Sequence, residues 1–142
     1  MSTVIARPGW ALAAAIVAVV FGVLTIISGG VALFGGDAAR AAVGDAVPFV
    51  LWFNFLSGFA YVVAGAGLFF WARWAAPLAM LIAAAILIVF AAFGWHVATG
   101  GAFEMRTVYA MTLRAAVWIA IALPACRALG CFGSTPAGRR PS

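Results

Sequence analysis

Four long apolar segments separated by short polar segments run along this chain, and they predict four helices long enough to cross a lipid bilayer. Three segments contain no Asp, Glu or Arg: residues 8–36, 46–72 and 74–103. The fourth, residues 107–126, is interrupted only by Arg114. A bilayer-spanning helix needs about 20 mostly apolar residues. We therefore expect helices at about residues 10–34, 48–71, 75–97 and 105–125.

Small and polar residues recur on these segments at helical spacing, as expected where membrane helices pack closely against one another. The stripes are Gly22, Thr25 and Gly29; Asn54, Gly58, Tyr61 and Gly65; and Ala83, Ala84, Leu87, Ala91 and Gly94. With short connections between the segments, they predict an all-α integral membrane fold, an antiparallel four-transmembrane-helix bundle.

The first and third connections carry the same motif. Residues 35–40 and residues 100–106 each contain Gly-Gly, then an acid, then an arginine. The motif suggests two related helical hairpins derived from one unit. Glycine pairs also end helices for purely local reasons, so both readings stay open.

Composition agrees with a single membrane domain. Hydrophobic residues make up 68% of the chain and charged residues 8%, whereas soluble domains carry about 25% charged residues. We assign residues 1–132 to the membrane domain and residues 133–142 to a disordered basic tail. The net charge of +5 comes from arginines between the spans and in the tail, so nucleic acid is not an expected partner.

The arginines predict an orientation. With both termini in the cytoplasm, five arginines lie on the inside: Arg7, Arg73, Arg127, Arg139 and Arg140. Only Arg40 and Arg106 then lie outside, together with all three acids. The positive-inside rule favours this arrangement. On the reducing cytoplasmic side, Cys126 and Cys131 are expected to be thiols.

Several polar residues within the spans lie at similar depth. A helix advances 1.5 Å per residue, which places Asn54 about 10 Å and Arg114 about 13 Å below the outer ends of their helices. Thr25 and Ser28 fall in the outer half of the first span. We predict an outward-facing polar pocket at these residues and Tyr61, roofed by His96, Glu104 and Arg106.

Arg114 is the residue that most needs an explanation, because a charge near mid-membrane costs about 2.5–3.5 kcal/mol on insertion scales. Its side chain could extend toward the outer headgroups, pair with Glu104 or Asp45, or contact Asn54. Trp118, one turn deeper, could stack on the cation. The alternative is that Arg114 binds an anionic or carbonyl-bearing ligand.

Catalysis and metal chemistry have little support. His96 is the only histidine, which removes bis-histidine haem and multi-histidine metal sites within one chain. No nucleophile–base pair, phosphate loop or zinc-protease motif is present. We expect no cofactor. An enzyme that acts on a lipid or redox cofactor, with His96 or Tyr61 acting together with Arg114, ranks below the non-enzymatic functions.

The run from Trp52 to Phe55, followed by Tyr61 and by Trp71–Trp74, resembles many small four-span proteins of the bacterial inner membrane. The resemblance is architectural and names no activity. The leading expectation is a non-enzymatic accessory subunit or assembly partner of a larger membrane complex, or a homo-oligomer. The alternative is a small carrier or binding protein for an anion, quinone or lipid headgroup at Arg114.

Overall fold

The structure, a computed structural model, describes residues 7–129, and this part of the chain contains five α-helices and no strand. The helices are α1 (Gly9–Phe34), α2 (Asp37–Val43), α3 (Pro48–Phe69), α4 (Ala75–Ala98) and α5 (Met105–Leu129). The four long helices coincide with the four predicted spans, and each is long and apolar enough to cross a membrane. The predicted basic tail lies outside the described residues.

Helix α2 was not expected, since its residues were assigned to a loop. Its seven residues include four alanines, and alanine has the highest intrinsic helix propensity. Asp37 lies in the first turn and Arg40 in the last, where each charge complements the helix dipole. Glycines in the left-handed region flank the helix, with φ of 83° at Gly36 and 61° at Gly44.

Two predicted helix ends are wrong. Helix α3 stops at Phe69, and Trp71 adopts a positive φ of 53° that turns the chain toward α4. Helix α5 continues through Pro124 to Leu129, beyond its predicted end at about residue 125. Proline removes one backbone donor but its fixed φ is compatible with a helix, so the last turns can form at the cost of that hydrogen bond.

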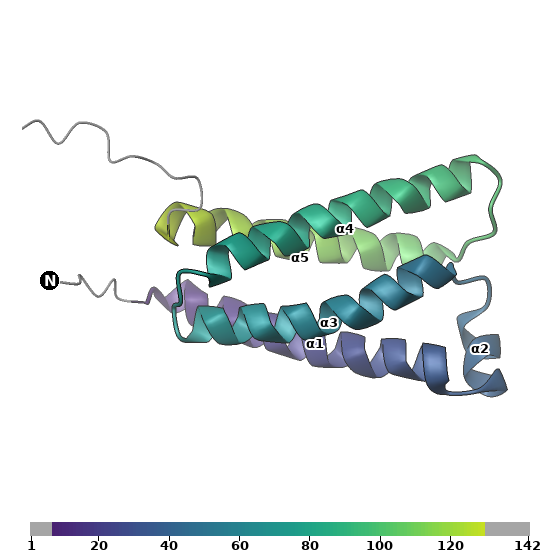
Figure 1. The fold of residues 1–142 in the computed structure, drawn as a ribbon, viewed down its shortest axis with the longest axis horizontal. Helices are drawn as coiled ribbons and strands as arrows, with labels where there is room; N and C mark the ends of the chain where they lie inside the picture. The colour runs from purple at the N-terminus through teal and green to yellow at the C-terminus, as the bar shows by residue number, and fades with distance from the viewer. Residues whose placement is uncertain (1–6, 130–142) are drawn as a thin grey trace, which may run out of the picture.

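Successive long helices run in opposite directions along the long axis of the molecule (Figure 1). The helices pack closely in the pairs α1–α3, α4–α5 and α3–α4, and α2 packs on α1. Helices α1 and α5 are not among these closely packed pairs. The bundle is therefore closely packed from α1 through α3 and α4 to α5, whereas α1 and α5 do not pack closely against each other.

The α1–α3 contact is built on the predicted glycines. A Cβ added to Gly22 would lie 2.8 Å from the Gly58 carbonyl oxygen, and one added to Gly65 would lie 3.0 Å from the Val19 nitrogen. Only glycine allows the two backbones to approach this closely. The predicted stripes on these two helices therefore mark a real packing surface.

The stripe predicted on α4 is largely wrong. Ala83 is buried, but Ala84, Leu87, Ala91 and Gly94 are exposed. The buried residues of α4 are Ala75, Ala76, Ala79, Ile82, Ala83, Ile86 and Phe93. Because alanines occur all around this helix, residue size does not distinguish its packed side from its free side.

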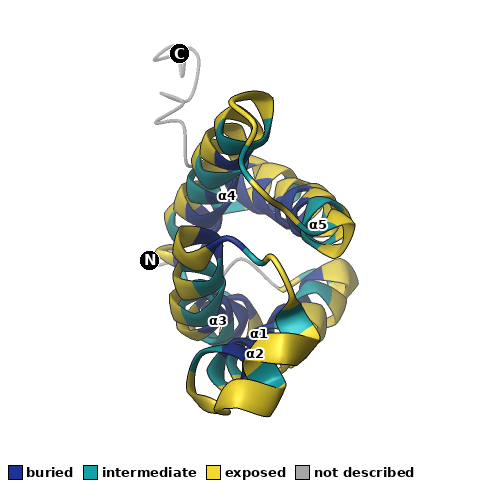
Figure 2. Ribbon diagram, turned by 90° about the vertical axis from the view of Figure 1, so that its right-hand side faces the viewer, coloured by how far each residue is buried: buried dark blue, intermediate teal, exposed yellow. Residues whose placement is uncertain are grey.

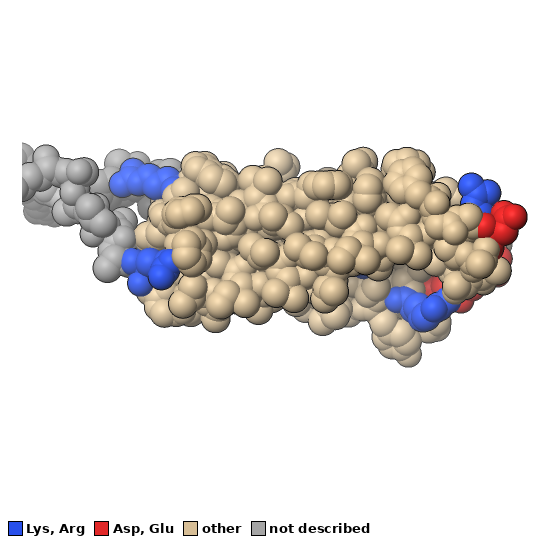
Figure 3. All heavy atoms as spheres, turned by 90° about the horizontal axis from the view of Figure 1, so that it is seen from below, with Lys and Arg blue, Asp and Glu red and all other residues tan. Residues whose placement is uncertain are grey.

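Charged side chains gather at the two ends of the molecule, and the long surface between them is almost uncharged (Figure 3). The buried residues face inward toward the middle of the bundle (Figure 2). We call the end that carries α2 and the α4–α5 connection the α2 end. All three acids, Asp37, Asp45 and Glu104, belong to its helix termini and connections.

Candidate ligand-binding site at Arg114

Arg114 lies inside the bundle rather than on its surface. The residue is on α5, about 13 Å along the helix from its start at Met105. Only 9% of Arg114 is exposed, and its Nε and Nη1 atoms are buried without a hydrogen-bond partner. The guanidinium is therefore a buried cation with unused donors.

One aromatic ring lies against this cation, and two further rings pack in series behind it. The guanidinium carbon lies 5.9 Å from the centroid of the Phe21 ring on α1, within the range of a cation–π contact. The rings of Phe21 and Tyr61 stack at 6.0 Å, and those of Tyr61 and Trp118 lie 4.8 Å apart. The ring that lies over the cation is thus that of Phe21, whereas the Trp118 ring packs at a tilt of 39° against Tyr61.

The buried polar atoms near Arg114 are mostly donors. Besides Nε and Nη1 of Arg114, the Trp118 Nε1 and the Asn54 Oδ1 are buried without a hydrogen-bond partner. The Tyr61 hydroxyl interacts with the side chains of Arg114 and Ser57. Arginine and tryptophan side chains donate only. Leaving one buried polar group unsatisfied costs about 1–3 kcal/mol, so this cluster favours an added acceptor oxygen.

A cavity of about 260 Å³ lies beside the guanidinium, between α1, α3 and α5 at the α2 end. We call it the Arg114 cavity. Its lining residues are Ser28, Gly29, Ala32, Val43, Ala46, Leu51, Asn54, Glu104, Arg106, Thr107, Ala110 and Arg114. A buried cation and an unpaired amide oxygen thus line the same space.

Two hydrogen bonds tie together the connections that border this cavity. The backbone N–H of Asp45 donates to Glu104 Oε1 at 2.9 Å, and Arg106 Nη2 donates to the Ala42 carbonyl oxygen at 2.9 Å. Gly44 passes so close to the Glu104 carboxylate that any Cβ would collide with it. The segment after α2 is thereby fastened to the start of α5.

The structure brings together most of the residues predicted for the pocket. Ser28, Asn54, Glu104, Arg106 and Arg114 line the Arg114 cavity. Thr25 lines a neighbouring cavity that also contains Ser28 and Arg114. Tyr61 is fully buried and lines neither of the two cavities.

His96 does not line the Arg114 cavity. Its Nε2 lies 3.0 Å from the Ala102 carbonyl oxygen, and its ring packs edge-on against Phe49. These contacts hold the α4–α5 connection against α3. The prediction that His96 roofs the pocket is therefore wrong.

Sequence reasoning missed two contributors. Phe21 was not singled out because a phenylalanine in an apolar span carries no distinguishing signal. Thr107, which lines the Arg114 cavity, follows Arg106 at the start of α5. Its position on the first turn of a helix that carries a buried arginine could have identified it.

No group of three or more His, Cys, Asp or Glu side chains that could hold a metal ion occurs within residues 7–129. The donors at Arg114 are suited instead to negatively charged or carbonyl oxygens.

Comparison of the chain with family models, curated proteins and solved structures finds no match.

Proposed function

We propose that this chain is a four-span membrane protein that binds the anionic group of a small molecule or lipid at Arg114. The observation that carries the proposal is that Arg114 lines a cavity while two of its guanidinium nitrogens, Nε and Nη1, are buried without a hydrogen-bond partner. A buried cation left without a partner is strongly unfavourable, and an anion that accepts its hydrogen bonds removes the penalty.

The donor set favours a carboxylate or a phosphate over a neutral carbonyl group such as that of a quinone. Charged acceptors form shorter and stronger hydrogen bonds with arginine than neutral acceptors do, and both anions match the planar fork of the guanidinium. The cavity volume of about 260 Å³ is slightly below the range usual for whole drug-sized ligands. It therefore suits a headgroup better than a complete large molecule.

The proposed location is the bacterial inner membrane, with both termini in the cytoplasm. The apolar length of the four long helices supports membrane insertion. The arginine counts of the two sides support the orientation. In this orientation the Arg114 cavity lies in the outer half of the membrane, and its bordering connections face outward.

A second candidate function is that of an accessory subunit of a larger membrane complex or of a homo-oligomer. The observation in its favour is the lack of close packing between α1 and α5. A partner helix that carried an acidic side chain could enter between them and pair with Arg114. Both candidates are binding functions, and neither requires catalysis.

Replacement of Arg114 by glutamine tests the proposal. The full chain is purified in a mild neutral detergent, and bound small molecules and proteins are identified by mass spectrometry. We expect the unmodified protein to retain an acidic small molecule or lipid that Arg114→Gln loses, because two charge-assisted hydrogen bonds and their cation are removed.

Arg73→Gln is the matched control, since it also removes one positive charge but lies in the α3–α4 connection. It should retain the ligand. If Arg114→Gln keeps the same acidic molecule as the unmodified protein, the binding proposal fails. Loss of a stoichiometric partner protein in Arg114→Gln, with no small molecule in either sample, would support the accessory function instead.

A further inference from the structure

Three cavities are each lined by residues of both α1 and α5. The Arg114 cavity lies nearest the α2 end. A second cavity of about 340 Å³ is lined by Phe21, Leu24, Thr25, Ile27, Ser28 and Arg114. Because Ser28 and Arg114 line both, the first two cavities are neighbours.

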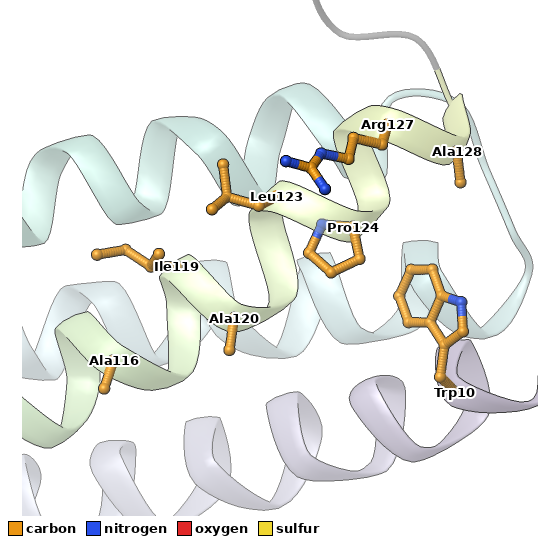
Figure 4. Close-up of a pocket in the computed structure, with 8 residues that line it drawn as sticks. All are labelled: Trp10, Ala116, Ile119, Ala120, Leu123, Pro124, Arg127 and Ala128. Atoms are coloured by element: carbon orange, nitrogen blue, oxygen red, sulfur yellow. The ribbon is translucent and has the colours of Figure 1, made fainter.

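The third cavity, of about 710 Å³, lies farther along α5 beside the start of α1. We call it the far cavity. It is lined by Trp10, Ala116, Ile119, Ala120, Leu123, Pro124, Arg127 and Ala128. Figure 4 shows Ala116 and Ala120 directed toward α1, with the Trp10 ring rising from α1 toward Pro124.

The Arg114 cavity and the far cavity differ in the side chains that line them. The Arg114 cavity carries two arginines, one glutamate, an asparagine and two hydroxyls in its lining. The side chains that line the far cavity are apolar except for Arg127 and the indole N–H of Trp10. The small side chains of Ala116 and Ala120 leave room there that larger residues would fill. A molecule lying along the three cavities would therefore be polar at the α2 end and apolar beyond Arg114.

The distance along α5 from Arg114 to the end of the far cavity also matches the length of a hydrocarbon chain. Thirteen residues separate Arg114 from Arg127 on α5, which is a rise of about 20 Å and close to the length of an extended long acyl chain. With the acidic group at Arg114, the hydrocarbon chain would cross the middle of the bundle and end near Arg127, close to the end of α5.

We infer that the ligand is an acidic amphiphile, whose carboxylate or phosphate binds Arg114 and whose hydrocarbon chain lies between α1 and α5 in the far cavity. This inference rests on the proposed function and adds to it a binding site for the ligand's hydrocarbon chain. Two sources share the chemistry, a free fatty acid and an acidic phospholipid.

The test measures binding to delipidated full-length protein by native mass spectrometry in a neutral detergent. The probes are palmitate and phosphatidic acid, with acetate, inorganic phosphate and hexadecanol as comparisons. We expect at least one of the two chain-bearing acids to bind about ten-fold or more tightly than the short acids and the alcohol, a difference of about 1.4 kcal/mol. The acid that binds more tightly identifies the source.

Ala120→Phe fills the far cavity and should weaken binding of the chain-bearing acid about ten-fold. Ala91→Phe is the matched control, because Ala91 is exposed on α4 and lines none of the three cavities. It should leave binding unchanged. Ala116→Val makes a smaller change in the same cavity and should give an intermediate loss, which serves if Ala120→Phe folds poorly.

The outcomes distinguish failure of the hydrocarbon-chain site from failure of anion binding at Arg114. If acetate or inorganic phosphate binds as tightly as the chain-bearing acids and Ala120→Phe has no effect, the chain site is wrong while anion binding at Arg114 stands. If Arg114→Gln binds every acid as the unmodified protein does, both the inference and the proposed function fail. Equal binding of hexadecanol and palmitate would overturn the acidic part of the inference.

Discussion

At the residue scale, Arg114 shows what one position in a sequence can and cannot reveal. A single charge inside an apolar span is visible at once and identifies the residue as exceptional. Its surroundings are not visible, because they depend on how α5 is rotated and on which helix it faces. Trp118 is one turn away on the same helix, yet the recorded cation–π partner is Phe21 on α1.

For the other predicted site residues too, the depth along the helix was predictable but the direction of the side chain was not. Asn54 and Ser28 were placed at the right depth by counting helical rise, and both line the Arg114 cavity. His96 is at the right end of the molecule but is turned toward the Ala102 carbonyl oxygen. Depth follows from the sequence in a membrane helix, whereas the direction of a side chain follows from packing.

At the scale of the helices, glycine spacing was informative on α1 and α3 but alanine spacing was not informative on α4. Glycine in a helix interior lowers intrinsic helix stability, so repeated glycines indicate a reason to bring backbones together. Alanine is favoured in any helix and occurs on both sides of α4. The short helix α2 was missed because seven residues are too few to show a periodic pattern.

Gly58→Ala should destabilise the α1–α3 pair. The added Cβ would lie 2.7 Å from Ile26 Cγ1 and 3.0 Å from the Gly22 carbonyl oxygen, so the two helices must move apart. Overpacking of this kind costs about 1–3 kcal/mol. Thermal unfolding followed by circular dichroism in one detergent should show a lower Tm.

Gly94→Ala is the matched control on α4, where a Cβ would meet nothing within 4 Å. It should leave Tm unchanged or raise it, since alanine is the better helix former by about 1 kcal/mol. An equal loss of stability in both variants would show that the glycines act through local helix propensity and not through the α1–α3 contact.

At the scale of the whole molecule, four spans were predictable but the parting of α1 and α5 was not. Each helix needs only its own residues to be recognised, whereas an opening between the first and last helices depends on all the packing angles between them. Each of the three cavities is lined by residues of both α1 and α5. The site therefore combines a residue evident from the sequence with a space that only the arrangement of helices creates.

The orientation in the membrane is open to a direct test. A fluorescent protein that matures only in the cytoplasm should be bright when fused after Ser142. Alkaline phosphatase, which is active only outside the cytoplasm, should be active when fused after Gly101 and inactive after Ser142. The expectation follows from the excess of arginines at the proposed inner side.

Cys126 provides an independent reason to make this measurement. It is disulfide-bonded in the structure, contrary to the expectation of a thiol, and Cys131 lies outside the described residues. Disulfides persist mainly in oxidising compartments, so the redox state of Cys126 in native membranes also tests the orientation: a thiol supports a cytoplasmic C-terminus and a disulfide supports the reverse. Phosphatase activity after Ser142 and none after Gly101 would establish that reverse orientation.

The central claim is that the Arg114 guanidinium binds the acidic group of a ligand. The most direct measurement is the Nε–H resonance of Arg114 in nitrogen-15 arginine-labelled protein, assigned by its absence in Arg114→Gln. We predict that palmitate or phosphatidic acid shifts this resonance, because Nε gains an acceptor that it lacks in the unliganded protein, and that hexadecanol does not. An Arg114 resonance that stays unchanged at saturating concentrations of both acids would contradict the claim.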